Sequence, residues 1–582
     1  MRRLIVMAAV IAAAALLIAP VAAADSPSFS SGGNTYRVGV AKDFDTLNPL
    51  STASTLSFAL LYDEYDFLTR YTTDYVVAPQ LATKWKVSPD GKTWTFTIRS
   101  GVKWSDGAAL TAPDIVFTYD LVLRSQNPNF IGYLQYVTKV DSPDDATVVI
   151  TTSRPSVRML NLLIPILPEH IWGRLSDRRL ETFKNVPLVS SGPFQVQGAS
   201  RGHTVVARAN PHYWGGRPSV DEVRYFVYKS SKSMVKDYAK GGLDAVLEPD
   251  AGSVPDLKAV AGTTVTTKPG FSWNGIAFNC LSAGLWKHNL LADKTIRQAV
   301  SWAIDKDAIA QACTAGLAKG ATTVVPDWSS WHWTPPAGSL MTFDPAKATA
   351  LLDAAGYVDR NHDGVRESNS GRPLAFGFAA PTDFAYGRTE ARLVARYLSK
   401  VGIKIKVALM PQSALIRKMY NGSLDMYSIG WYGEPDPAFI LSVVTVGSSG
   451  GLNDTGFVDP EYDRVFTKQI SALDPTKRAA LVDQLQRIAY EQAPYIPVWY
   501  DPEVQAWRSD RFHGWVQAPP GGAMDFNYLY DTYVKLAPGA AAAPEAGGSG
   551  GTVAIVGGVI AAVLVVGIAV VLLRRRRAPA AS

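Results

Sequence analysis

The chain of 582 residues has few of the side chains that carry most protein chemistry. Its two cysteines, Cys280 and Cys313, lack CxxC spacing, which argues against a redox or zinc pair. The seven histidines are scattered and form no HExxH motif, so a zinc enzyme is not expected. A P-loop, GxxxxGKS or GxxxxGKT, is absent, so this chain is not expected to hydrolyse a nucleotide. A GxSxG pattern at 447–451 continues as a loop instead of a helix, so no catalytic residue is predicted.

The chain also lacks an excess of charge over most of its length. Lys and Arg number 57, Asp and Glu number 51, and the formal net charge is +6. Six of the basic residues are arginines near the two ends, Arg2, Arg3 and residues 574–577, where no acid occurs. The rest of the chain is therefore balanced, and nothing in it indicates a nucleic-acid partner.

Long hydrophobic runs are confined to the two ends. Arg2 and Arg3 precede an apolar run over residues 4–19, and Ala22, Ala23 and Ala24 offer small residues for cleavage. This pattern is typical of a secretory signal peptide, predicted over residues 1–24. A permanent membrane helix is the alternative, but the run is short for a full span. No cysteine lies near the cleavage point, so a lipid anchor is not expected there.

Residues 553–573 are uncharged and would span about 31 Å as a helix, which matches a hydrocarbon core. The arginines at 574–577 favour the cytoplasmic side. We therefore predict a C-terminal transmembrane helix at 553–573, a cytoplasmic tail at 574–582 and an extracellular location for the bulk of the chain. Residues 537–552, rich in Ala, Pro and Gly, are predicted to be a flexible linker. A removed lipid-anchor signal is the alternative, although such tails usually end in their apolar run. Outside the cytosol the two cysteines could form a disulfide, which their spacing neither requires nor forbids.

Strand and helix signals alternate between these ends, which predicts an α/β fold of two or three domains. Asp344-Pro345 and Asp474-Pro475 each read as a helix start, with the acid as cap and proline in the first turn. Asp293 is predicted to cap a third helix that runs from residue 294 to 315 and ends at Gly316.

The most specific local pattern covers residues 88–123. Asp90-Gly91 is a hairpin turn signal, and the following residues 94–98 alternate apolar with polar side chains, as in a half-buried strand. Thr111, Pro113 and Asp114 then have the spacing of a capped helix start. Further motifs follow this pattern or precede it in a fixed order along the chain: FDTLNP at 44–49, PQLA at 79–82, Trp85, SGPF at 191–194, ANPHYWGG at 209–216, FN at 278–279, IRQA at 296–299, IDK at 304–306 and YIPV at 495–498.

In this order the motifs resemble those of the extracellular solute-binding proteins of the peptide/nickel class (family 5) of ABC transporters. The resemblance implies a two-lobed periplasmic-binding-protein-like fold with an extra inserted domain, whose lobes close over a ligand. It implies lobe I at 33–66, 188–270 and 515–536, the inserted domain at 67–187 and lobe II at 271–514. It also implies an importer subunit that captures peptides or similar small polar solutes and delivers them to an ABC permease with separate ATPase subunits. The alternative is a receptor ectodomain that binds a sugar, a nickel chelate or a signalling peptide without catalysis.

The resemblance points to the segment GWYGEPDP at 430–437 as the ligand site. Peptide-binding relatives present an acid three residues after the tryptophan, and here that residue is Glu434 after Trp431. A carboxylate in a desolvated cleft would bind the ligand's ammonium group through a charge-assisted hydrogen bond. Tyr432 and Asp436 are expected to contribute beside it, and Asn279 near the hinge. A surface loop with solvated acids is the alternative.

Three other patterns leave alternatives open. Some dipeptide binders offer an arginine for the ligand carboxylate in the region of 380–388, which here holds Phe384, with Arg388 and Arg392 the nearest bases. The tryptophans at 328, 331 and 333 could line the cleft or pack on the prolines that follow them. Residues 359–370 begin like a calcium loop but have serine at the twelfth position, so a turn stabilised by Asp and Asn is preferred to a metal site.

Overall fold

The computed structural model describes residues 34–41, 44–198, 204–282, 289–448, 452–523 and 531–539. These residues belong to one compact unit. The predicted signal peptide at 1–24, the predicted transmembrane helix at 553–573 and the tail at 574–582 lie outside the described ranges, as does most of the predicted linker. Among the helices that are described, none is both long enough and apolar enough to cross a bilayer.

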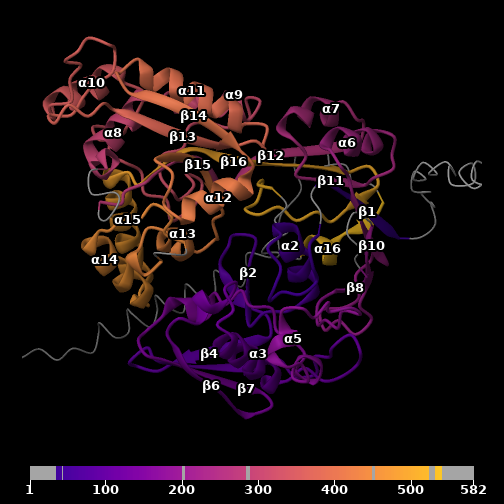
Figure 1. Cartoon of the computed structure of the whole chain (residues 1–582). Helices are drawn as coiled ribbons and strands as arrows, with labels where there is room; N and C mark the ends of the chain where they lie inside the picture. Colours follow the sequence, from indigo (N-terminus) through magenta and orange to yellow (C-terminus); the bar gives the residue numbers. More distant parts are fainter. Residues whose placement is uncertain are drawn as a thin grey trace, which may run out of the picture. The chain divides into compact units, whose positions relative to one another are not determined.

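A ten-stranded mixed sheet runs through the molecule and establishes the predicted α/β class (Figure 1). Its parallel pairs include β13 with β14 and β1 with β10, whereas β12 and β16 are antiparallel to their neighbours. The strands lie in this order: β14 (Lys404–Met410), β13 (Ala375–Pro381), β15 (Met426–Trp431), β12 (Thr263–Phe278), β16 (Tyr495–Arg508), β11 (Ala245–Leu247), β1 (Thr35–Val40), β10 (Glu222–Val227), β9 (Val205–Ala209), β8 (Phe194–Gly198).

Two long strands, β12 and β16, join the two halves of this sheet. The last six residues of β12 pair with β15 on one side, and residues 505–507 of β16 pair with β11 on the other. The ladder between β12 and β16 is interrupted between Pro269 and Trp273, opposite Pro502 and Tyr500. Proline has no N–H to donate to a ladder, so prolines on both strands weaken the pairing at this point. The predicted boundary between residues 270 and 271 falls inside this interruption.

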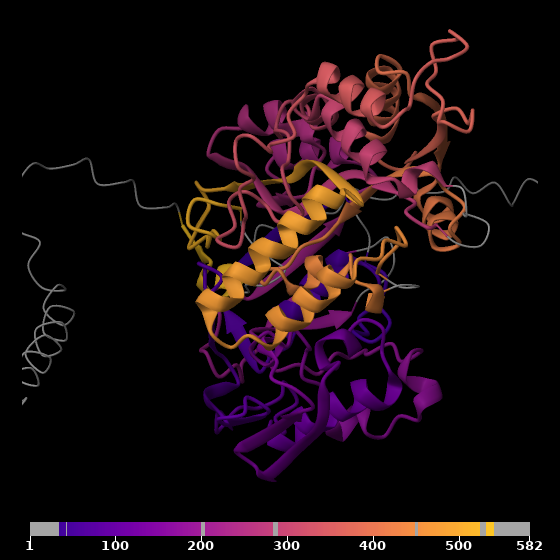
Figure 2. The same ribbon diagram turned by 90° about the vertical axis from the view of Figure 1, so that its left-hand side faces the viewer.

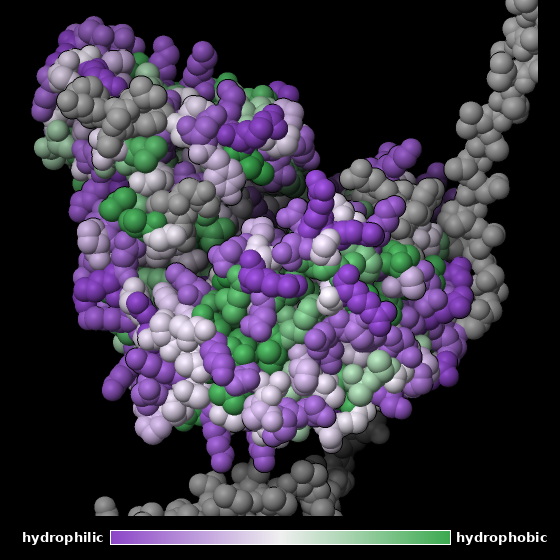
Figure 3. Space-filling view, turned by 60° about the horizontal axis from the view of Figure 1, so that its bottom comes forward, coloured by the Kyte–Doolittle hydropathy of each residue, from purple (hydrophilic) through white to green (hydrophobic). Residues whose placement is uncertain are grey.

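A separate four-stranded antiparallel sheet lies within residues 67–187, at the bottom of Figure 1. Its strands have the order β4 (Ala82–Val87), β5 (Thr93–Ile98), β7 (Thr147–Thr152), β6 (Val137–Asp144), and helix α3 (Ala112–Ser125) packs on β6 and β7. The predicted local pattern is confirmed, since the apolar residues of β5 are buried and the Asp114 carboxylate accepts a hydrogen bond from the Thr111 N–H. Figure 3, which views the molecule from this end, shows hydrophilic side chains interspersed with apolar ones.

The helices of the second half of the chain cover the β14–β16 part of the sheet. Asp344 and Asp474 cap α10 (Pro345–Ala354) and α15 (Pro475–Gln492) as predicted, by accepting hydrogen bonds from the N–H groups of Lys347 and Lys477. Helices α14 (Pro460–Ser471) and α15 lie side by side, as Figure 2 shows.

The predicted single helix over 294–315 is wrong, because the structure has two helices there. Helix α8 (Lys294–Ala303) ends at Ile304, which is extended and buried, and α9 (Lys306–Cys313) follows. The Asp305 side chain accepts a hydrogen bond from the Ala308 N–H and starts the second helix. Cys313 at its end is a free thiol, and so is the buried Cys280.

The remaining elements connect these parts. They are α2 (Thr55–Glu64), η1 (Ile131–Leu134), η2 (Val157–Leu160), α4 (Glu169–Trp172), α5 (Asp177–Leu180), α6 (Ser231–Ala239), η3 (Ala251–Ser253), α7 (Val254–Lys258), η5 (Leu290–Ala292), α11 (Gly387–Ser399), α12 (Gln412–Tyr420), α13 (Ala438–Ser442), η6 (Val446–Ser448), α16 (Asp531–Lys535) and the short strands β2 (Thr69–Tyr71), β3 (Val77–Pro79), β17 (Phe512–His513) and β18 (Ala537–Pro538). The β17–β18 pair includes the first two residues of the predicted linker.

Candidate functional site

The candidate segment at 430–437 leaves the sheet at the end of β15. Strands β13, β14 and β15 run parallel, so their last residues meet at one edge. Trp431 there pairs with Trp273 of β12, next to the interruption in the long ladder. Gly433 comes so close to Phe271 that an added Cβ would lie 2.6 Å from the Phe271 carbonyl oxygen. A glycine at this position therefore lets the segment pack against the junction of the two sheet halves.

Glu434 is half-buried and faces the domain at 67–187. Its Oε1 accepts a hydrogen bond of 2.6 Å from the hydroxyl of Tyr133, in η1. Burial raises the pKa of Glu434 to about 7, although the Tyr133 hydrogen bond and the charge of Arg158 both oppose the rise. The carboxylate thus sits where a further cationic donor would strongly favour its ionised form.

Asp436 has a different environment only two residues away. Arg478 of α15 donates to both its oxygens, each at 2.6 Å, and Asn161 donates to Oδ2 at 2.9 Å. The N–H of Ala438, the first residue of α13, also donates to Oδ1. Burial alone would raise the pKa of Asp436, but the charge and hydrogen bonds of Arg478, the Ala438 N–H and the charge of Arg158 together hold the pKa below the usual value. Both oxygens of Asp436 are occupied by protein donors, which indicates a structural role.

The structure brings Trp431, Tyr432, Glu434 and Asp436 together but leaves Asn279 elsewhere. Trp431 and Tyr432 are half-buried, and Trp431 packs against the core under the sheet. Asn279 follows the opposite end of β12, roughly 20 Å along the paired strand from Trp431. Its amide donates to the carbonyls of Gly422 and Leu424. Its oxygen accepts from Leu281, so the side chain shapes that loop and does not join the other candidates.

A polar network that sequence reasoning missed lies at the same edge of the sheet. Asn274 donates to both oxygens of Asp501 at 2.7 Å and accepts from the Tyr386 hydroxyl at 3.1 Å. Asp501 also accepts from the indole of Trp499 at 2.9 Å. No local sequence pattern connects its members, because they come from three distant segments of the chain.

Comparisons with known proteins agree with this architecture. The family model described as "Bacterial extracellular solute-binding proteins, family 5 Middle" matches residues 76–451, more than half of the chain. The chain belongs to this family. Protein XP55 of Streptomyces lividans is 30% identical over 77% of this chain and 80% of its own length. The dipeptide-binding protein of Escherichia coli (strain K12) is 25% identical over 76% and 84%, respectively.

A solved structure extends the likeness to the fold. The oligopeptide-binding protein AppA of Bacillus subtilis, in complex with a nonapeptide, superposes with a TM-score of 0.72 at 23% identity. The match covers 87% of this chain and 98% of that chain. As a family 5 solute-binding protein, the chain is the binding component of an ABC importer and not an enzyme. An extracellular or periplasmic location is typical of this family.

The three tryptophans at 328, 331 and 333 each pack against a different partner. Trp328 packs against Phe271 with ring centroids 4.6 Å apart, and Tyr75 of the 67–187 domain lies 4.8 Å from the same phenylalanine. Trp331 receives the Arg478 guanidinium on its ring at 4.8 Å, and Trp333 packs edge-on against Tyr490. Trp328 is therefore the one of the three that meets the junction beside the candidate segment.

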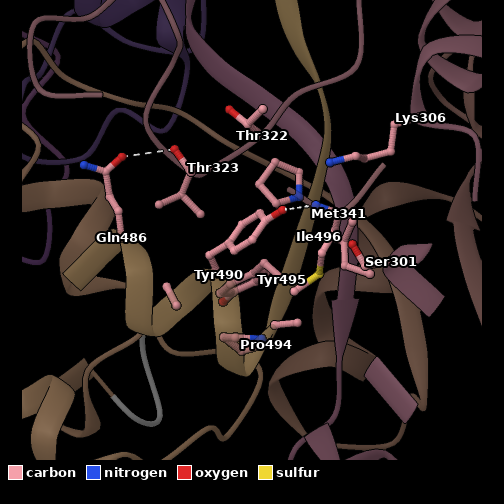
Figure 4. Close-up of a pocket in the computed structure, with 14 residues that line it drawn as sticks. Ser301, Lys306, Thr322, Thr323, Met341, Gln486, Tyr490, Pro494, Tyr495 and Ile496 are labelled. Atoms are coloured by element: carbon pink, nitrogen blue, oxygen red, sulfur yellow. Dashed lines mark hydrogen bonds between the residues drawn. The ribbon is translucent and has the colours of Figure 1, made fainter. Parts of the chain in front are cut away.

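A small cavity of about 20 Å³ lies away from the candidate segment, among α8, α15 and the start of β16 (Figure 4). Thr323 donates to Gln486 at 3.0 Å across it, and the Tyr490 hydroxyl accepts from the Met341 N–H. Lys306 at its rim donates to the carbonyl of Ala321, and burial lowers its pKa to about 8. None of the candidate ligand residues lines this cavity.

Proposed function

We propose that this chain is the membrane-anchored extracellular binding subunit of a peptide importer. Residues 33–66, 188–270 and 515–536 would form lobe I, residues 67–187 the inserted domain and residues 271–514 lobe II. Residues 537–552 would tether this body to a transmembrane helix at 553–573. Capture by lobe closure would then present the ligand to a permease that is driven by separate ATPase subunits.

The observation that carries the peptide assignment is the Glu434 carboxylate at the edge of the sheet. It is half-buried, it holds one protein hydrogen bond at Oε1, and it stands three residues after Trp431. An α-ammonium group is a suitable partner for such a carboxylate, because a charge-assisted hydrogen bond gains strength away from water. A relative named for dipeptide binding and a structural neighbour that holds a nonapeptide support the same ligand class.

Contacts between residues 67–187 and residues 271–514 support the closure mechanism. Tyr133 bonds Glu434, Asn161 bonds Asp436, and Tyr75 packs on Phe271. Each contact joins the inserted domain to lobe II next to the interruption in the β12–β16 ladder. A hinge needs backbone that can change its dihedral angles at low cost, and a ladder weakened by prolines on both strands provides it.

The region at 380–388 supports a ligand longer than a dipeptide. Phe384 and Tyr386 stack there with ring centroids 5.4 Å apart, and the Tyr386 hydroxyl is committed to Asn274. Arg388 and Arg392 are exposed on α11. A carboxylate at the end of a short ligand would find aromatic rings at this position, so we propose that the site accepts peptides without clamping both ends.

The test is calorimetric titration of the full-length protein in nanodiscs with tripeptides to nonapeptides and with their N-acetylated forms. Glu434→Gln should weaken binding of the free peptides about tenfold to a hundredfold, since a hydrogen bond to a charged group is worth roughly 1.5–3 kcal/mol. It should leave the N-acetylated peptides unaffected. Glu461→Gln, an exposed acid on α14, is the control. Equal losses for both peptide forms would remove the ammonium role from Glu434, and binding of oligosaccharides or nickel–histidine alone would replace the peptide assignment.

A further inference from the structure

Three carboxylates converge in the loop between α10 and β13. Asp359, Asp363 and Glu367 each offer an oxygen, and these oxygens lie within 4.8 Å of one another. The loop is closed by backbone bridges between Val358 and Glu367 and between Glu367 and Pro373. The three acids are thus held close together by the backbone, although like charges at this separation repel each other.

One of these acids has an oxygen that is withdrawn from water without a donor, and another is almost fully buried. Oδ1 of Asp359 is inaccessible to solvent and has no hydrogen-bond partner, whereas Oδ2 accepts from the Gly364 N–H at 3.0 Å. Glu367 is only 6% exposed, and its Oε2 accepts a hydrogen bond from the Arg360 N–H at 2.8 Å. A buried carboxylate oxygen without a donor is costly, so native proteins rarely leave one unsatisfied.

The neighbouring protein cations are used elsewhere. The guanidinium of Arg360 donates to backbone carbonyls and to the Asn369 amide oxygen. Arg366 pairs with Asp353 at 2.5 Å and donates to the carbonyls of Tyr357 and Val401. Within the described residues, no ion pair includes any of the three converging acids. The exposed Asp363 accepts hydrogen bonds from the Asn361 amide and the Val365 N–H, which are neutral donors. The negative charge of the three acids is therefore not balanced by a described protein cation.

We propose that Asp359, Asp363 and Glu367 bind one calcium ion. Calcium takes several oxygen ligands in flexible geometry, whereas magnesium demands a strict octahedron. The acids stand at the first, fifth and ninth positions of the loop, Asn361 is at the third, and Gly364 at the sixth has the positive φ of +85° that the sharp turn requires. Ser370 replaces the bidentate glutamate expected at the twelfth position, so the affinity belongs at the weak end of calcium loops, with Kd of about 10⁻⁴ to 10⁻³ M.

The ion would fasten the connection between α10 and β13. The loop enters β13 at its first residue, which is the edge of the sheet opposite Pro381 and Trp431. Figure 1 shows α10 at the top of the view and the four-stranded sheet at the bottom. The calcium site is therefore distinct from the ligand site and independent of the proposed ligand.

The test uses the full-length protein in nanodiscs after treatment with a chelator. Calorimetric titration with CaCl₂ should show saturable binding of one ion per chain, and calcium should raise the melting temperature where equal magnesium does not. Asp359→Asn and Asp363→Asn should each abolish both effects. Asp363 is exposed, so its variant is expected to fold even if loss of the Asp359 charge disturbs the loop.

Asp353→Asn is the matched control, because it breaks the neighbouring ion pair with Arg366 but keeps the three ligands. It should retain the whole calcium response. The proposal is overturned if calcium binding does not saturate, if magnesium acts equally, or if the Asp363 variant still responds to calcium.

Discussion

At the scale of single residues, two acids in one turn show how surroundings divide their roles. Glu434 meets one hydroxyl and stays half-buried, and its pKa rises to about 7. Asp436 meets Arg478 through two hydrogen bonds and stays ionised. The sequence offers both as equivalent candidates in GEPDP, but only the fold reveals that one already has its cation. This difference is why we propose Glu434, and not Asp436, as the residue that binds the ligand.

Glu390 provides a residue-scale prediction about pH. It is fully buried on α11 and accepts a hydrogen bond of 2.5 Å from Ser428. Burial raises its pKa to about 8, the nearby Asp501 charge adds to the rise, and the Ser428 bond opposes it. A raised folded-state pKa means that the folded chain holds a proton that the unfolded chain releases above about pH 4.5. The free energy of unfolding should therefore fall as the pH rises from about 4.5 to about 8.

Glu390→Gln should reduce this loss, because glutamine resembles the protonated acid. Urea denaturation at several pH values between 5 and 9 should give the variant a flatter profile than the native chain. The exposed Glu461→Gln variant should keep the native profile. A Glu390→Gln profile as steep as the native one would assign the pH dependence to other buried acids, such as Glu64.

At the scale of elements, a helix or strand could be predicted from the sequence where the residues that determine it lie close together in the chain. The hairpin and capped helix of 88–123 could be predicted, because turn glycine, alternation and cap lie within one stretch. The capped starts of α10 and α15 have the same local origin. The break between α8 and α9 was missed although Asp305 is a local cap signal, because the apolar spacing continues across Ile304.

Asp305→Ala tests whether the Asp305 cap maintains the break between α8 and α9. Loss of the hydrogen bond to the Ala308 N–H should lower the free energy of unfolding by about 0.5–2 kcal/mol, the usual value for an N-cap. Asp305→Asn, which keeps an acceptor, should restore most of the stability. Denaturant titration of the three proteins gives the comparison, and an alanine variant as stable as the native chain would leave the break to the packing of Ile304 alone.

At the scale of the whole molecule, the site depends on residues that no local pattern connects. Tyr133 and Glu434 are 301 positions apart, and Asn161 and Asp436 are 275 apart. The resemblance to family 5 indicated the segment at 430–437, but it did not indicate which residues of the inserted domain meet it. Asn279 lies apart from the other candidates for the same reason, since its neighbours in space are set by the β12–β15 register.

In the lobe closure that we propose, the Tyr133–Glu434 hydrogen bond should influence the balance between open and closed forms. Tyr133→Phe removes the donor but keeps the ring, and the closed form should lose roughly 1.5–3 kcal/mol where the acceptor is ionised. The same loss would shift an open–closed equilibrium about tenfold to a hundredfold toward the open form. Small-angle X-ray scattering of the full-length protein without ligand should then give a larger radius of gyration for the variant above pH 7, where Glu434 is ionised.

Saturating peptide should return the variant to the native radius, because the ligand supplies new contacts between the lobes. Tyr136→Phe is the control, since this half-buried tyrosine of the same domain carries Arg154 on its ring and its loss of a hydroxyl leaves Glu434 untouched. The native chain and the Tyr133 variant could instead have equal radii of gyration without ligand at every pH. This result would mean that the Tyr75–Phe271 contact and the Asn161–Asp436 hydrogen bond are enough to maintain the closed form. The contribution of Glu434 would then lie in binding the ligand and not in closing the lobes.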